Sequence, residues 1–148
     1  VKEMQVLHPN IVPDHIFLAS GTGSTQAGII AGCQEVGWFH TQVHGISVAR
    51  DKNRGVEAIL EALVFVYTEP APITPNINFY DEYRFGGYGK YDQQLLNFIN
   101  DAAEKSGIIL DPTYTGKGFY GMMDVVTQKK LSGNILFWHT GGLLNLMA

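Results

Sequence analysis

Apolar runs that suit β-strands alternate along this chain with segments that repeat at helical spacing. A run at 16–19 is followed by a helix-like stretch of small residues at 26–36, and a β-branched run at 43–48 is followed by helical periodicity over 56–64. The alternation continues with candidate strands at 77–80 and 135–138 and candidate helices at 95–103 and 120–130. Strands separated by helices pair in parallel, so the pattern predicts an α/β fold with an open, mostly parallel sheet and helices on both faces.

Breaker residues mark the joints between these elements. The prolines at 70, 72 and 75 predict an irregular connection, and Gly107 is the stop signal of the helix that precedes it. A glycine-rich stretch at 86–89 predicts a loop after the third strand. The length of 148 residues suits one domain, so we expect a single α/β domain over 1–148.

The charge balance excludes nucleic acid as a partner. Lys and Arg number 10 against 14 Asp and Glu, a net charge of −4, so the chain does not attract a phosphate backbone. Charged residues are 16% of the chain, whereas globular domains typically have about 25%. A chain so short of charge is expected to cover part of its surface against something else.

The cysteine count and the absence of long apolar stretches indicate in which cellular compartment the protein is expected. Cys33 is the single cysteine, so the chain cannot form an internal disulfide. No apolar stretch approaches the roughly 20 residues of a membrane span, and the N-terminus lacks the pattern of a signal peptide. We therefore expect a cytoplasmic protein with no membrane partner. The sequence begins at Val1 rather than Met, which indicates that part of the gene product is absent.

The segment Ser20–Thr25 reads Ser-Gly-Thr-Gly-Ser-Thr between a predicted strand and a predicted helix. Glycines let a ligand approach the backbone, and the amides of a first helical turn lack partners and attract anions. The segment is not a P-loop, because Ser24 rather than Lys follows Gly23, nor a dinucleotide turn, because Gln26 stands where Gly or Ala is needed. Two interpretations stay open: an anion site, or a helix start that needs small capping residues.

The five histidines give no metal-binding pattern. His40 and His44 are spaced four residues apart, but neither has a cysteine or carboxylate nearby. We therefore expect structural or exposed histidines and no metal site. Cys33 lies among small residues of a predicted helix and is expected to be a buried small hydrophobe.

Three motifs in order carry a resemblance to a known family. Thr22-Gly-Ser-Thr-Gln-Ala-Gly28 is similar to the phosphate loop of D-cysteine desulfhydrases and 1-aminocyclopropane-1-carboxylate deaminases. The stretches Gly107–Lys117, with Asp-Pro-Thr-Tyr-Thr-Gly-Lys, and Ile135–Gly142, with Trp-His-Thr-Gly-Gly, resemble the C-terminal part of the same enzymes. These are fold type II, tryptophan-synthase-β-like enzymes that use pyridoxal 5'-phosphate. The resemblance runs over nearly the whole chain but covers only about the C-terminal half of a family member.

The resemblance implies a role for several residues. Tyr114 and Tyr88 would be catalytic, Tyr114 facing substrate and cofactor and moving a proton. Thr115 follows Tyr114 where the deaminases carry a glutamate near the pyridine nitrogen, which favours the desulfhydrase branch, and Thr140 would meet that nitrogen with its hydroxyl. The cofactor phosphate would be held by Gly21, Thr22, Gly23, Ser24 and Thr25.

The lysine that binds the cofactor covalently in this family lies in the N-terminal half of its members. None of the seven lysines here stands in a comparable context (Lys2, Lys52, Lys90, Lys105, Lys117, Lys129 and Lys130). Lys117, the nearest to an expected site residue, is predicted to be solvated or to face the substrate. We expect these residues to be the C-terminal portion of an enzyme whose lysine-bearing part is absent, and to be inactive alone.

The resemblance implies a pyridoxal-phosphate-dependent lyase that eliminates sulfide from D-cysteine and releases pyruvate and ammonia. A 1-aminocyclopropane-1-carboxylate deaminase is the alternative, and a partial domain that binds phosphate-bearing ligands without catalysis is another. A small amino acid is the expected substrate, and a second copy of the chain, in a homodimer, is the expected partner.

Overall fold

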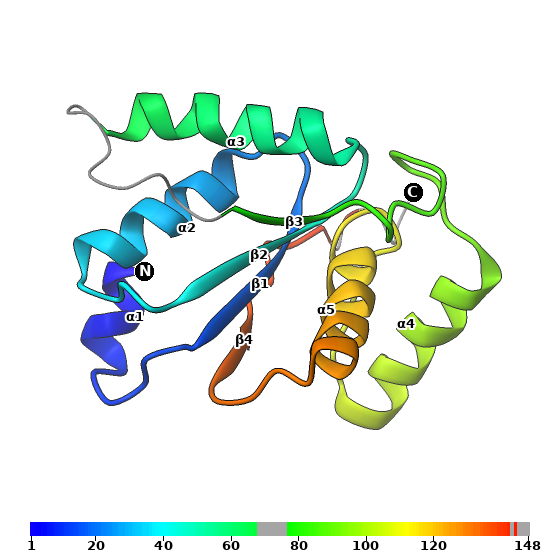
Figure 1. Cartoon of the computed structure of the whole chain (residues 1–148). Coiled ribbons are helices and arrows are strands. Elements are labelled where there is room, and N and C mark those ends of the chain that lie inside the picture. The colour runs from blue at the N-terminus through cyan, green and yellow to red at the C-terminus, as the bar shows by residue number, and fades with distance from the viewer. Residues whose placement is uncertain (68–76, 143, 145–148) are drawn as a thin grey trace.

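The computed structural model describes residues 1–67, 77–142 and 144, and its centre is a parallel sheet of four strands in the order β3-β2-β1-β4 (Figure 1). The strands are β1 (His15–Ser20), β2 (Gln42–Ser47), β3 (Asn78–Tyr80) and β4 (Ile135–Phe137). All three pairings are parallel, and all six residues of β1, which lies inside the sheet, are buried. The predicted α/β class with an open parallel sheet is confirmed.

Helices cover both faces of this sheet (Figure 1). On one face lie α2 (Ser24–Glu35) and α3 (Lys52–Val66), and on the other lies α5 (Thr115–Lys129), against which α4 (Gln93–Ser106) packs. A short N-terminal helix, α1 (Lys2–Leu7), lies beside the end of α2. The two-sided cover explains why the inner strands read as nearly continuous apolar runs.

Alternate residues of β1 supply the two cores. Ile16 and Leu18 point to the side of α2 and α3, where they join Ile59 of α3. Phe17 points to the opposite side and packs with Ile46 of β2 and the buried residues of α5. This alternation fixes the register of the sheet, because a shift of one residue would exchange the two faces.

Two helices differ from the expectation. The N-terminal helix α1 was not predicted, and α5 begins at Thr115, five residues before the predicted start at 120. Glycines in its first turns hide the helix in the sequence, yet they let it approach the sheet: a Cβ on Gly118 would lie 3.1–3.3 Å from atoms of Ala19 in β1. The predicted connection at prolines 70, 72 and 75 lies outside the described residues.

Two buried histidines, one from β1 and one from β2, lie next to each other on the α5 side of the sheet. His15 Nδ1 lies 3.0 Å from His44 Nε2, and His44 Nδ1 lies 3.2 Å from the hydroxyl of Tyr80. The ring of His44 stacks on Phe17 with centroids 4.3 Å apart. His44 is thus buried, and its ring contacts His15 and Tyr80. Cys33 is buried, as expected, and burial raises its pKa to about 11.

We expect the fold to lose stability as the pH falls from about 6.5 to about 4. Burial, followed by the charges of His15 and Lys129, lowers the pKa of His44 from 6.5 to about 4. Between these values the unfolded chain binds the proton and the folded chain does not, so acid favours unfolding by roughly 2–3 kcal/mol. Urea unfolding at several pH values measures this. His44→Phe should flatten the profile over this range, and an unchanged profile would contradict the assignment.

Candidate functional site

The carboxyl ends of the four parallel strands lie at one edge of the sheet, where such sheets bind ligands. Hydrogen bonds join the segments that leave this edge. Val48, just after β2, donates its amide to the Ser20 carbonyl at the end of β1 over 3.2 Å. Arg50 reaches the Thr22 carbonyl with its guanidinium at 3.4 Å. The turn after β1 is therefore anchored to the segment after β2.

The glycine turn Ser20–Thr25 opens α2 with a left-handed residue. Gly23 is the N-cap, with φ +91°, and a Cβ there would lie 3.0–3.2 Å from atoms of Ile59 and Ala58 in α3. No side chain within the described chain caps the amides that follow. Thr22, Ser24 and Thr25 are exposed. The turn thus presents hydroxyls and uncapped amides at the positive end of a 12-residue helix, which is what an anion requires.

The Asp111 carboxylate builds the start of α5 on the same edge. One of its oxygens accepts hydrogen bonds from the amides of Thr113 and Tyr114, both at 2.9 Å. The other accepts from the amide and the hydroxyl of Thr115, both at 2.8 Å. Asp111 and Thr115 are fully buried. The predicted cofactor residue Thr115 therefore lies beneath the edge with its hydroxyl bonded to Asp111, and its contact with a cofactor stays a prediction.

The structure brings Tyr88 and Tyr114 together. Their hydroxyl oxygens are 2.6 Å apart, and their rings meet edge to face with centroids 5.8 Å apart. Tyr88 comes from the loop after β3 and is 64% exposed, whereas Tyr114 is the N-cap of α5. The hydrogen bond with Tyr88, then burial, raises the pKa of Tyr114. The Tyr114 phenol therefore keeps its proton at neutral pH, and the two hydroxyls lie close enough to pass a proton between them.

Thr140 follows β4 and is exposed at the same edge. The neighbouring His139 ring lies 3.0 Å from the Ile109 carbonyl through Nε2, and its Nδ1 accepts the amide of Gly141 at 3.2 Å. Gly142 lies so close to the Asp111 carboxylate that a Cβ would collide with it. The segment that carries Thr140 therefore packs against Ile109 and Asp111, just before the start of α5.

Lys117 is neither solvated nor directed toward a ligand, contrary to the expectation. It is fully buried, and its ammonium lies 2.7 Å from the carbonyl of Gly87, 2.8 Å from that of Arg84 and 3.4 Å from that of Val48. Burial lowers its pKa to about 8, although the charge of Asp111 opposes this.

Sequence reasoning assigned no role to Asp111 and the wrong environment to Lys117. An aspartate four residues before a threonine, with proline between them, is a helix-start signal that could have identified Asp111. For Lys117 the one signal is its place among glycines that bring a helix close to a sheet.

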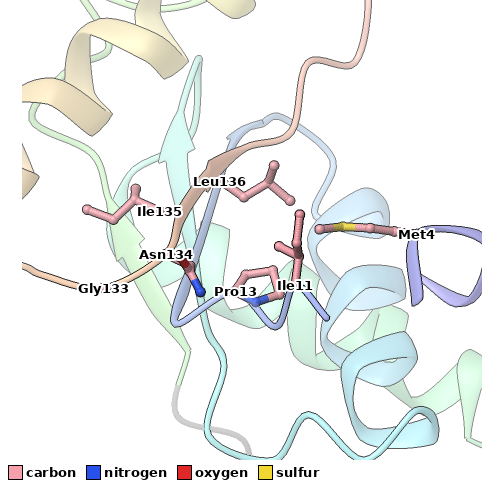
Figure 2. A pocket seen from close by; sticks show the side chains of 7 residues that line it. All are labelled: Met4, Ile11, Pro13, Gly133, Asn134, Ile135 and Leu136. Atoms are coloured by element: carbon pink, nitrogen blue, oxygen red, sulfur yellow. The ribbon is translucent and has the colours of Figure 1, made fainter. Parts of the chain in front are cut away.

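A pocket of about 260 Å³ lies at the opposite, amino-terminal edge of the sheet (Figure 2). Its walls are mostly aliphatic, and the Asn134 side chain is bonded to the Val12 carbonyl at 3.1 Å. None of the predicted site residues lines it. The lining residues are Met4, Ile11, Pro13, Gly133, Asn134, Ile135 and Leu136.

Two other kinds of site find no support among the residues that the structure describes. No three of their His, Cys, Asp or Glu side chains are grouped so that they could hold a metal ion. None of the described helices combines the length and apolar character needed to cross a membrane.

Comparisons with known proteins agree with the motifs. A D-cysteine desulfhydrase of Serratia proteamaculans is 36% identical over 146 residues, which are 94% of this chain and 43% of that protein. A Pyrococcus furiosus protein, named provisionally as a 1-aminocyclopropane-1-carboxylate deaminase, is 35% identical over 132 residues, 88% of this chain and 40% of that protein. The chain thus spans about two fifths of the length of these relatives.

A solved structure described as an ACC deaminase homologue superposes with a TM-score of 0.72 at 33% identity, over 95% of this chain and 43% of that one. The predicted family resemblance is confirmed. A family model described as "Pyridoxal-phosphate dependent enzyme" matches residues 3–141, nearly the whole chain. The chain belongs to this family of pyridoxal-phosphate-dependent enzymes.

Proposed function

We propose that the carboxyl edge of the sheet binds pyridoxal 5'-phosphate, with its phosphate on the turn 20–25. The uncapped amides after Gly23 and the exposed hydroxyls of the turn fit a dianionic phosphate. Thr140, whose side chain is exposed, is the candidate partner of the pyridine nitrogen. Thr115 is buried beneath this edge and would affect the site indirectly, because its hydroxyl and the Tyr114 amide both donate hydrogen bonds to the Asp111 carboxylate. The phosphate ligands would be Gly21, Thr22, Gly23, Ser24 and Thr25.

We further propose that the protein is a lyase of the D-cysteine desulfhydrase type. When bound, the cofactor supplies an electron sink for charge that develops on the substrate. The observation that carries the proposal is the 2.6 Å contact between the Tyr88 and Tyr114 hydroxyls at this edge. Tyr114 can give a proton to the departing sulfur, and Tyr88 can return one to Tyr114. In balance, D-cysteine and water yield pyruvate, ammonia and hydrogen sulfide.

Deamination of 1-aminocyclopropane-1-carboxylate is the second candidate. The solved structure and the Pyrococcus furiosus relative, both described as deaminases or their homologues, support it. Thr115 favours the desulfhydrase, because a neutral residue follows Tyr114 where the family's deaminases carry a glutamate.

Product analysis with the full-length protein and added cofactor decides between the two. We expect sulfide and pyruvate from D-cysteine, and a fall in kcat of roughly 100-fold or more in Tyr114→Phe and Tyr88→Phe. Tyr91→Phe, an exposed tyrosine of the same loop, is the matched control and should keep its activity. The four-carbon keto acid from the cyclopropane substrate, without sulfide from D-cysteine, would assign the deaminase, and neither product would reject both.

A polypeptide of these 148 residues alone should release no sulfide or pyruvate from D-cysteine. All seven of its lysines lie in the described ranges; six are exposed, and Lys117 is held by three carbonyls. None stands in a sequence context like that of the family's covalent lysine, which lies in the N-terminal half of family members. Sulfide assays with saturating cofactor measure this, and turnover by this polypeptide would contradict the prediction.

We also propose that the protein forms a homodimer. The outer side of α3 exposes apolar side chains, with Leu60 42%, Val64 73% and Phe65 89% exposed. Burying such a surface between two copies would remove it from water at roughly 25 cal/mol per Å². Light scattering over a dilution series should give a dimer mass that Val64→Glu lowers. A monomer at every concentration would contradict the proposal.

A further inference from the structure

Lys117 is a buried cation at the N-terminal end of a helix, where the helix dipole is unfavourable to positive charge. It lies in the first turn of α5, at the positive end of the helix dipole, and is fully buried. Removing an ammonium from water costs several kcal/mol unless its hydrogen bonds are replaced, and an apolar side chain would pack there at lower cost. Packing of the side chain alone therefore does not explain why a lysine stands at this position.

The contacts of the Lys117 ammonium join three segments. Its three N–H groups have three acceptors, all of them backbone carbonyls: Gly87 at 2.7 Å, Arg84 at 2.8 Å and Val48 at 3.4 Å. Two of these carbonyls belong to the loop after β3, and the third to the segment that follows β2. The ammonium thus ties that loop to α5 and to the sheet edge.

The loop after β3 needs such a tie to hold its shape. Phe85, Gly86, Gly87 and Gly89 all have positive φ angles, from 52° to 124°. The backbone hydrogen bonds of these turns run from the Gly87 amide to the Arg84 carbonyl and from the Lys90 amide to the Gly87 carbonyl. The carbonyls of Arg84 and Gly87 are acceptors in those same bonds. The Lys117 ammonium therefore binds the carbonyl that accepts the closing hydrogen bond of each turn.

Tyr88 is the residue that this arrangement positions. It follows Gly87 directly and is 64% exposed, so its own packing does little to hold it, yet its hydroxyl meets that of Tyr114 at 2.6 Å. Tyr114 lies three residues before Lys117 on the same helix start. We propose that Lys117 is a positioning residue that fixes the Tyr88 hydroxyl against the Tyr114 hydroxyl. This proposal rests on the proposed function, in which both hydroxyls serve the substrate.

Titration of the tyrosine rings tests the proposal without the reaction. In the full-length protein with ring-labelled tyrosine, NMR should place the pKa of Tyr114 above its ordinary value, and Tyr88→Phe should lower it. Lys117→Met should lower it in the same way, and the double variant no further, because both changes remove one contact. Lys90→Met, an exposed lysine of the same loop, is the matched control and should leave the titration unchanged.

A merely structural lysine would give a different result. Lys117→Met would then lower the melting temperature but leave the titration of Tyr114 unchanged, or its effect would add to that of Tyr88→Phe; either outcome overturns the proposal. If Lys117→Met does not fold, Lys117→Gln replaces it under the same criteria, since its amide can donate to two carbonyls at most.

Turnover separates this proposal from the function on which it rests. Lys117→Met should lower kcat as much as Tyr88→Phe does, roughly 100-fold, with KM changed less than about threefold. A Tyr88→Phe variant with full turnover would reject the proposed role of the tyrosine pair, while the ring titration would still decide whether Lys117 positions Tyr88. A Lys117→Met variant with full turnover beside an impaired Tyr88→Phe would overturn the positioning role alone.

Discussion

Gly23→Val should reduce the affinity for pyridoxal 5'-phosphate by roughly 10- to 100-fold. Gly23 has φ +91°, which a β-branched residue does not adopt without strain of about 1–3 kcal/mol, and a Cβ would press on Ile59 and the backbone of Ala58. The turn must relax away from α3, which rotates the amides of Ser24 and Thr25. Each 1.4 kcal/mol lost in binding is a tenfold loss of affinity.

Absorbance or fluorescence titration with the cofactor measures this loss, and inorganic phosphate with NMR of the turn amides gives an independent reading. Gly28→Ala is the matched control: Gly28 is an exposed glycine of the same helix with nothing within 4 Å of its added Cβ. It should keep the affinity and stabilise α2 by up to about 1 kcal/mol. Unchanged affinity in Gly23→Val would show that the phosphate binds elsewhere and that the turn is a helix start with small residues.

The sheet could be predicted because its signal is local and repeated. Both inner strands are buried on two faces except at Gln42, and each is followed by a helix, so their parallel pairing needs no knowledge of distant contacts. The start of α5 could not be predicted in the same way. Gly116 and Gly118 lower its helical propensity. Gly118 is needed because α5 packs closely on β1, and Gly116 because a Cβ there would collide with the Asp111 carbonyl and with Ile99 of α4.

The parts of the site that stand in sequence motifs could be predicted, whereas the contacts between segments distant in the sequence could not. The turn 20–25 and the two tyrosines stand in recognisable motifs, although their roles in binding and catalysis stay predictions. The burial of Lys117 was not predictable, because a lysine is rarely fully buried. Its acceptors lie 30, 33 and 69 residues away, and the loop geometry that presents two of them depends on residues with positive φ.

Asp111→Ala should destabilise the fold by about 3 kcal/mol, more than a change at any exposed helix cap. The buried carboxylate accepts hydrogen bonds from the amides of Thr113, Tyr114 and Thr115 and from the Thr115 hydroxyl. Hydrogen bonds to a charged group contribute about 1.5–3 kcal/mol each, and donors left unpaired in the core add a desolvation cost. The bonds share one carboxylate, so their contributions do not simply add.

Urea unfolding of both variants measures the difference against Asp92→Ala, the matched control. Asp92 caps α4 through a single bond to the Leu95 amide at 2.9 Å and is exposed, so its loss should cost about 1 kcal/mol. The two carboxylates do the same chemical work at helix starts and differ in burial and in the number of amides that they hold. Equal losses of unfolding free energy in the two variants would contradict the prediction. They would mean that water can replace the Asp111 carboxylate, and that this carboxylate does not hold the start of α5 and Tyr114 in place.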